Sequence, residues 1–422
     1  MKTSETKSAQ QAGAPKIVDP YDLPLDSIDP SQRILFQQDA HWSYFERLRA
    51  EDPVHHTSQS EFGPFWSVTR YADIKYVDTH HELFSSKGGV TLGGNEADFQ
   101  LPMFIAMDPP EHDVQRKVVA PATGPRNLAV LESQIRDRVV NILDSLPRGE
   151  EFNWVQQVSI ELTTQMLATL FDVPFEDRYK LTHWSDVATL PPGPAGPVET
   201  PEQRRSELLE CLDYFSDLWK ERAGRPSAGN DLISILAHSP ATRDMKPMEL
   251  LGNVLLLIVG GNDTTRNSLT GGVLALNQYP EEYEKLREQP SRIPNMVSEV
   301  IRWQTPVAHM CRRATTDVEL GGKKIRQGEV VCMWFVSGNR DPEVFEDANE
   351  LQIDRPNVRS HLSFGFGIHR CMGNRLGEMQ VRIVWEELLK RFYKVEQIGE
   401  PTRVPSSFIR GYSALPVRLI PR

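Results

Sequence analysis

Apolar residues recur at three- and four-residue steps through most of the chain, the spacing that places side chains on one face of a helix. Between residues 128 and 223 this spacing predicts three helices. A longer helix is predicted from about Pro247 to Gln278, and shorter ones follow in "EEYEKLREQ" and "MVSEVIRWQ". Another helix is predicted near the start of the chain, from about Trp42 to Ala50.

Strand signals are fewer. "FWSVTRY" is strand-like, and "VELGGKKIRQGEVVCMWF" alternates apolar and polar residues around three glycines, which predicts a small antiparallel sheet. The glycine-rich "SSKGGVTLGGNEADFQLP" and the proline-rich "LPPGPAGPVETP" read as loops, the second as a flexible surface connection. The pattern predicts a mainly α fold with a small β component.

We expect one large domain over residues 31–422. The first residues, "MKTSETKSAQQAGAPK", are polar and hold few large apolar side chains, so residues 1–30 are expected to form a disordered or loosely attached lead. The apolar run "VLLLIVGG" is too short to cross a bilayer. We therefore expect no membrane span, and a cytoplasmic protein.

Charge and cysteine content narrow the function further. The chain has 58 acidic and 47 basic side chains and a net charge of -11, which argues against nucleic-acid binding as its main function. Its four cysteines, Cys211, Cys311, Cys332 and Cys371, are widely separated and lack CxxC spacing. Neither a disulfide framework nor a zinc ribbon is indicated.

Cys371 stands in an unusual loop, "SFGFGIHRCMGNR". It could be a small buried hydrophobe, and zinc is disfavoured because only His361 and His369 are near and no fourth ligand follows. Glycines in the loop permit the main chain to approach something large and flat, and amides at the start of the next helix can stabilise a thiolate. A cysteine so placed suits an axial ligand to haem iron.

The stretch "FGFGIHRCMG" carries the complete pattern FGxGxHxCxG, and the chain resembles the cytochromes P450, the haem-thiolate monooxygenases, from about Phe45 to Arg418. The resemblance implies the cytochrome P450 fold, haem b as cofactor with Cys371 as the iron ligand, and O2 as co-substrate.

The predicted long helix supports this resemblance. "GGNDTT", Gly260 to Thr265, places glycines, an acid and hydroxyl residues, all poor helix formers, inside an apolar helix. A structural kink is the alternative to a widened groove for dioxygen. The segment is similar to the family's acid-alcohol pair, which implies that Asp263 and Thr264 handle protons.

Two further groups of residues match the family. Glu299 and Arg302 lie three residues apart on one helical face, and the resemblance adds Arg355 as the third member of a buried structural cluster. For the haem propionates, either Arg312 or Arg313 could serve, and the spacing to Asp317 favours Arg312. The residues implied to bind the cofactor are His112, Arg116, Gly260, Arg312, Phe364, Gly365, His369, Cys371 and Gly373.

The substrate is indicated by resemblance alone. Segments around the residues above are similar to soluble bacterial alkane 1-monooxygenases, which implies terminal hydroxylation of medium-chain n-alkanes to 1-alkanols. Fatty acids, terpenes or alkyl-aromatics are alternative substrates. The implied walls of a small apolar pocket are Leu101, Met103, Phe104, Ile105, Leu257, Ile258, Val307, Met310 and Phe408.

The chain shows no GxGxxG turn between strand and helix and no ferredoxin-like cysteine cluster, so electrons must come from outside. The resemblance implies a ferredoxin, reduced by a separate NAD(P)H-dependent ferredoxin reductase, and we expect the chain to be a monomer. A haem-based sensor would not need Asp263 and Thr264, and a peroxygenase would replace that pair. The basic residues expected to meet the ferredoxin are Arg116, Lys117, Arg359, Arg370 and Arg375.

Overall fold

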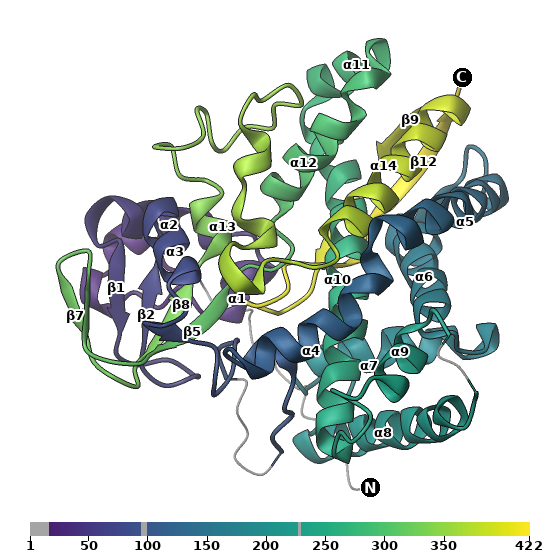
Figure 1. Ribbon diagram of the computed structural model, residues 1–422. Helices are drawn as coiled ribbons and strands as arrows, with labels where there is room; N and C mark the ends of the chain where they lie inside the picture. The colour runs from purple at the N-terminus through teal and green to yellow at the C-terminus, as the bar shows by residue number, and fades with distance from the viewer. Residues whose placement is uncertain (1–16, 94–98, 227–228) are drawn as a thin grey trace, which may run out of the picture.

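The long helix α10, Pro247–Gln278, runs through the middle of the molecule and has the bounds predicted for it (Figure 1). The computed structural model describes residues 17–93, 99–226 and 229–422. Helices α6, α7, α8, α12 and α14 pack directly against α10. The helices are α1 (Arg33–Gln37), α2 (His41–Glu51), α3 (Tyr71–Thr79), α4 (Glu111–Val119), α5 (Pro125–Ser145), α6 (Glu161–Phe171), α7 (Arg178–Thr189), α8 (Pro201–Ala223), α9 (Leu232–His238), α10, α11 (Pro280–Glu288), α12 (Ile293–Gln304), α13 (Phe335–Gly338) and α14 (Asn374–Arg391).

The main sheet lies to one side of the helices (Figure 1). Its strand order is β1-β2-β8-β5-β3, with β2 and β8 parallel and the other neighbours antiparallel. These strands are β1 (Val54–Thr57), β2 (Phe65–Val68), β3 (Phe84–Ser85), β5 (Met310–Ala314) and β8 (Val330–Met333).

One strand prediction is wrong. β6 (Val318–Leu320) and β7 (Lys323–Ile325) form the expected hairpin, but β8 does not join them and instead lies between β2 and β5. Val331, Cys332 and Met333 are successive buried residues, so β8 is covered on both faces. An apolar run without alternation belongs inside a sheet and not in a two-stranded ribbon.

The C-terminal strands were not predicted. β12 (Pro416–Pro421) pairs with β9 (Phe392–Gln397) and with β4 (Glu151–Asn153), while β10 (Thr402–Arg403) pairs with β11 (Tyr412–Ala414). Strands this short depend on partners that are distant in the sequence, so their own residues carry little signal.

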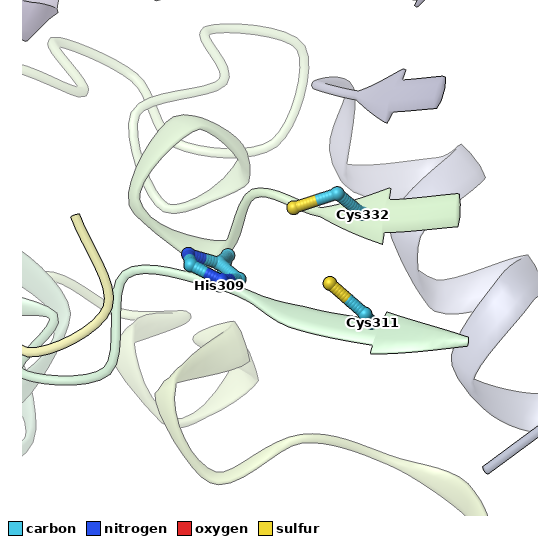
Figure 2. A group of neighbouring side chains, drawn as sticks. All are labelled: His309, Cys311 and Cys332. Carbon is cyan, nitrogen blue, oxygen red and sulfur yellow. The ribbon is translucent and has the colours of Figure 1, made fainter. Parts of the chain in front are cut away.

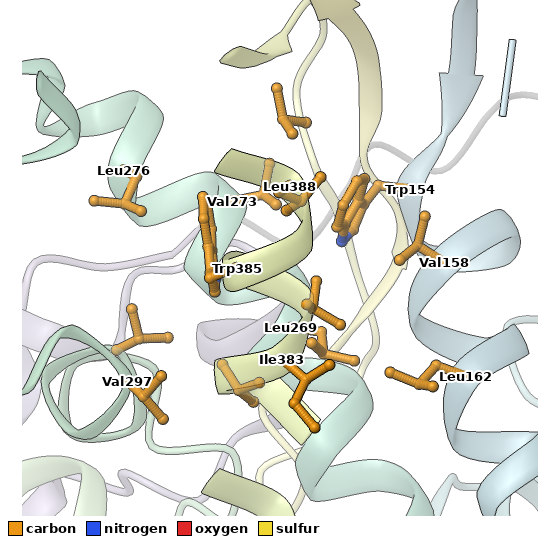
Figure 3. Packing of buried hydrophobic residues seen from close by; sticks show 14 of the residues in the cluster. Trp154, Val158, Leu162, Leu269, Val273, Leu276, Val297, Ile383, Trp385 and Leu388 are labelled. Carbon is orange, nitrogen blue, oxygen red and sulfur yellow. The ribbon is translucent and has the colours of Figure 1, made fainter. Parts of the chain in front are cut away.

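The core beside α10 is built around Trp385 of α14 (Figure 3). Gly272 of α10 faces this indole: a side chain there would begin 3.3 Å from Trp385 Nε1 and 3.3 Å from Val300. The glycine therefore lets α10, α12 and α14 approach closely, which holds the elements that carry the functional residues in one rigid body.

The expectation of a loose lead is wrong for residues 17–30; residues 1–16 lie outside the described residues. Ile28 is buried, and the hydroxyl of Tyr44 donates to the carbonyl of Val18 at 2.6 Å. The guanidinium of Arg47 donates to the carbonyls of Pro20 and Leu23. This segment is therefore packed on α2. Among the described helices, none combines the length and apolarity needed to span a membrane.

Candidate active site

A cavity of about 710 Å³ lies between α10, the loop before α4 and the loop that carries Cys371. Thr264 lines it from α10, and Cys371 lines it from the turn before α14. The segment 406–409 and the start of β5 close another side. Residues separated by more than two hundred positions therefore meet around one space.

Two glycines of the cysteine loop are required by α3. Gly365 and Gly367 have φ of +64° and +63°, a region that residues with a side chain rarely adopt. A side chain on Gly367 would begin 2.4 Å from the carbonyl oxygen of Asp78, and one on Gly365 would begin 3.1 Å from the Asp78 carboxylate. Gly373 differs, because a side chain there would meet nothing within 4 Å. Gly365 and Gly367 are therefore needed for packing against α3. All three glycines were expected to border open space, and only Gly373 does so.

The thiol of Cys371 is free. The sulfur is open to the cavity but lies deep inside the fold, and this burial raises its pKa against the opposing effect of the amides of Gly373 and Asn374 and the cations Arg116 and Arg370. The amides at the start of α14 are thus present as expected, but they do not outweigh burial. A cation at the sulfur is what would hold the thiolate form.

Four nitrogen-bearing side chains gather at one wall of the cavity, and three of them line it. The rings of His112 and His369 lie 4.3 Å apart, with His112 Nε2 and His369 Nδ1 buried and without a hydrogen-bond partner among the described residues. Arg312 lines the same cavity, as does Arg116, which donates to the carbonyl of Arg370.

His369 is neutral in this setting. Burial, with Arg312 and other nearby cations, lowers its pKa to about 2. It is therefore suited to donate a hydrogen bond rather than to supply charge.

These observations fit haem. A free thiol faces the cavity, open space surrounds Gly260 and Gly373, and two orphaned imidazole nitrogens stand beside two guanidiniums. Phe364 and Gly365 line the same cavity. The structure thus brings together all nine residues implied to bind the cofactor, except that His112 lies behind the lining and reaches it through His369.

Of the two adjacent arginines of β5, Arg312 lines the cavity and Arg313 does not. Arg312 is buried at the cavity, whereas Arg313 is half-buried and donates to the carbonyl of Gly328. Arg312 is also paired, since its Nη2 lies 2.8 Å from Asp78 Oδ1.

Asp78 is a site residue that the sequence reasoning missed. Its other carboxylate oxygen accepts from the amide of Phe366 at 2.6 Å, so it joins Arg312 to the cysteine loop. Burial raises its pKa despite Arg312. The sequence could have indicated Asp78, because this acid lies with Ile74 and Val77 on the apolar face of α3.

Asp263 and Thr264 point in different directions. Thr264 lines the cavity and its hydroxyl donates to the carbonyl of Gly260 at 3.0 Å. Asp263 is fully buried, outside the lining, and its Oδ1 lies 2.5 Å from Arg266 Nη2. Its Oδ2 accepts from the hydroxyls of Ser185 and Thr189 at 3.1 and 3.2 Å.

Arg266 links Asp263 to the surface. The same Nη2 lies 2.8 Å from Asp186 Oδ1, and the side chain of Asp186 is 27% exposed. Burial raises the pKa of Asp263, and the two carboxylates raise that of Arg266. This group of polar residues connects α10 to α7, and only its first member was expected.

Glu299 holds the predicted cluster together. Its Oε1 lies 2.7 Å from Arg302 Nη2 and 3.1 Å from Arg355 Nε, and all three side chains are buried. Arg302 also donates to the carbonyl of Asn339 at 2.7 Å.

Asn339 connects the Glu299 cluster to the cysteine loop. Its amide nitrogen donates to Ser363 Oγ at 2.9 Å, and its amide oxygen accepts from the backbone of Leu362 at 2.6 Å. The cluster therefore positions the loop and does not face the cavity.

Most of the expected substrate walls lie at the cavity, with one exception and one addition. Ile258 does not line the cavity, because it is fully buried in the separate apolar cluster that α10 forms with α6, α8 and α9. The proline-rich loop, expected to be a surface connection, contributes Leu190 and Pro191 instead. The expected residues found in the lining are Leu101, Met103, Phe104, Ile105, Leu257, Val307, Met310 and Phe408.

Comparison with known proteins agrees with this site. The sequence model described as Cytochrome P450 matches residues 210–410. Linalool 8-monooxygenase from Pseudomonas putida is 35% identical over 402 residues, which cover 92% of this chain and 98% of that protein.

Two solved structures are similar over nearly the whole chain. Cytochrome P450-153 from Novosphingobium aromaticivorans has a TM-score of 0.86 and 45% identity and covers 93% of this chain and 99% of its own. CYP153D17 from Sphingomonas sp. PAMC 26605 has a TM-score of 0.86 and 47% identity, with 93% and 98% covered. The fold class that the resemblance implied is confirmed.

Proposed function

This chain belongs to the cytochrome P450 family, whose members use haem b and O2 in monooxygenation, and on that premise we propose that it hydroxylates the terminal carbon of medium-chain n-alkanes. The observation that carries this proposal is the apolar wall beside Thr264, assembled from α10, the loop before α4, the start of β5 and the segment 406–409. When bound, haem would supply the activation of dioxygen, to which the thiolate of Cys371 contributes electron density.

The wall is held in place before substrate arrives. The amide of Phe104 donates to Asn253 Oδ1 of α10 at 3.0 Å. Gly252 lets the loop lie against α10, since a side chain there would begin 2.1 Å from the carbonyl oxygen of Pro102. The C–H bonds of a terminal methyl group are stronger than those of the methylene groups beside it. Hydroxylation at the chain end therefore requires that the substrate be positioned, and a rigid wall provides this.

A neutral substrate suits the cavity better than a carboxylic acid. Arg33, at its lining, is paired with Glu61 at 3.0 Å. Arg204 donates to the carbonyls of Val187 and Ala188. The ion pair of Arg33 and the backbone hydrogen bonds of Arg204 support a neutral substrate.

Protons reach the cavity through residues of α10. Thr264 presents a hydroxyl there, and Asp263 is connected through Arg266 to the partly exposed Asp186. A carboxyl whose pKa is raised by burial can take up and release a proton more readily than an ordinary surface aspartate.

We further propose that electrons come from an acidic ferredoxin on the Cys371 side. Arg359, Arg370 and Arg375 are exposed and form no ion pair within the part of the chain that the structure describes. All three lie near Glu378, where their charges act to lower the pKa of its carboxyl, and this proximity supports a shared basic region. Unpaired cations on an acidic protein suit an acidic partner.

The test is substrate-induced change of the haem spectrum across n-alkanes, fatty acids and cyclic hydrocarbons, with product regiochemistry for each binder. The proposal expects medium-chain alkanes to bind and to yield 1-alkanols. Binding confined to fatty acids, or hydroxylation away from the chain end, would contradict it.

A terpene substrate is the second candidate, favoured by the similarity to linalool 8-monooxygenase. It predicts that a branched terpene alcohol binds more tightly than an n-alkane of equal carbon number. The same binding series decides between the two.

A further inference from the structure

Two cysteines and a histidine that the proposed function does not use lie together in the main sheet (Figure 2). Cys311 of β5 is directly opposite Cys332 of β8, and His309 stands two residues before Cys311. All three are buried, and one potential ligand atom of each lies within 4.8 Å of those of the other two.

The backbone holds the two sulfurs close. The amide of Cys311 donates to the carbonyl of Val90 at 2.7 Å, away from β8. Cys311 and Cys332 are therefore a non-hydrogen-bonded antiparallel pair, the kind in which facing Cα atoms are about 4.5 Å apart and side chains are nearest.

His309 has the tautomer that a metal ligand needs. Its Nδ1 lies 2.9 Å from the carbonyl oxygen of Ser407, which can only accept, so Nδ1 carries the proton. Its Nε2 keeps its lone pair, which faces the amide of Leu92 at 3.3 Å, a long contact, and the thiol of Cys311. Metal-bound histidines usually donate their other N–H to such a carbonyl.

Space for a fourth ligand adjoins Cys311. A second cavity of about 180 Å³ is lined by Cys311 and Leu92, and also by Arg312 and Arg313. A water molecule occupies about 30 Å³ of liquid, so a water ligand fits there.

We propose that His309, Cys311 and Cys332 bind one thiophilic divalent cation of the Zn²⁺ class, with a water from the adjoining cavity as fourth ligand. Two thiolates, one imidazole and one open position form a tetrahedral donor set that zinc accepts. Each thiol releases its proton on binding, so two negative sulfurs balance the two positive charges and the buried site is neutral. The ion would bridge β5 and β8 beside Arg312.

The experiment uses the reduced holoenzyme, in which haem covers Cys371. Zn²⁺ is added, loosely held metal is removed with a weak chelator, and zinc per chain is measured by mass spectrometry. The matched control is Cys211→Ala, because Cys211 is buried alone in a different apolar cluster. Cys311→Val and Cys332→Val keep strand-forming side chains, and retained haem absorbance shows that they fold.

The proposal expects one zinc per chain in the wild type and in Cys211→Ala, and less than about a tenth of that in either valine variant. It also expects Zn²⁺ to raise the thermal midpoint of the wild type and not that of Cys332→Val. No retained zinc in the wild type, or equal retention in Cys332→Val, would overturn it. A Cys311–Cys332 disulfide found in the zinc-loaded protein would do the same.

Discussion

The carboxylate of Asp263 lies 2.5 Å from the guanidinium of Arg266 and is fully buried, while its neighbour Thr264 opens onto the cavity. The two residues expected to act as a pair thus occupy different environments. Asp263 belongs to an ion-pair network that leads to Asp186, and Thr264 presents its side chain to the cavity.

Asp263→Asn removes the carboxyl that can carry a proton but keeps its shape. Because positioned proton transfer contributes about 10²–10⁴-fold, we expect turnover to fall by about 10²-fold and the solvent deuterium isotope effect to rise. Substrate affinity should not change, since Asp263 does not line the cavity. Steady-state rates in H2O and D2O measure both effects. The control is Asp144→Asn, a surface change beside Arg391; equal rates in the two variants would contradict this role.

Thr264→Ala removes the hydroxyl at the cavity. We expect reductant consumption to continue while product per reductant falls by about 10-fold or more and hydrogen peroxide rises, because proton delivery loses its last donor. Quantifying product, peroxide and consumed reductant checks this. Thr270→Ala on the same helix removes a hydroxyl bonded to Ser159 and should leave coupling intact. Unchanged coupling in Thr264→Ala would exclude the assignment.

Leu257→Val shortens a side chain at the cavity wall, whereas Ile258→Val shortens its neighbour in the core. We expect the first change to shift hydroxylation from the terminal carbon towards the adjacent one. The second should cost about 0.5–1.5 kcal/mol of stability and leave regiochemistry unchanged. Product analysis by gas chromatography and urea midpoints separate the two effects. A regiochemical shift in Ile258→Val alone would contradict the assignment of the wall.

Arg375→Glu reverses a charge on the face proposed to meet ferredoxin. Because electrostatic steering raises association rates by about 10–10³-fold, we expect slower reduction by about 10-fold at low salt and a weaker dependence on salt. Stopped-flow reduction measures this, with substrate affinity unaltered. Lys324→Glu, on the distant β7, is the matched control (Figure 1). If reduction slowed equally in both variants, the proposal that ferredoxin binds the face carrying Arg375 would be contradicted.

Glu299→Gln leaves Arg302 and Arg355 buried without their carboxylate. Such an uncompensated charge costs about 3–5 kcal/mol, so we expect loss of stability and of haem. Burial would raise the pKa of Glu299, but hydrogen bonds and charge from Arg302 and Arg355 hold it below its usual value. Its contribution is therefore present above the unfolded pKa near 4.5 and is lost as pH falls further.

Urea midpoints at neutral pH and below pH 4.5 check this sign. The wild type should lose more stability on acidification than Glu299→Gln. A variant with the same pH dependence as the wild type would show that Glu299 is not the titrating group.

Local spacing was enough to predict the long helix and several site residues. The bounds of α10 follow from proline at its start and apolar periodicity along its length, both local properties. The sequence was enough to single out Cys371, Thr264 and the cluster around Glu299. Each belongs to a pattern whose residues lie close in the chain or match a known family.

Only the tertiary structure showed which way each side chain points and which residues far apart in the sequence meet. Adjacent helical residues point about 100° apart, so packing decided that Leu257 faces the cavity and Ile258 the core. Asp78 reaches the cysteine loop, and Cys311 meets Cys332, across long stretches of chain. The sequence by itself determined which chemical groups are present and where helices form, because those depend on neighbours in the chain. Only the fold decided which groups meet, because burial and strand register depend on contacts between segments far apart.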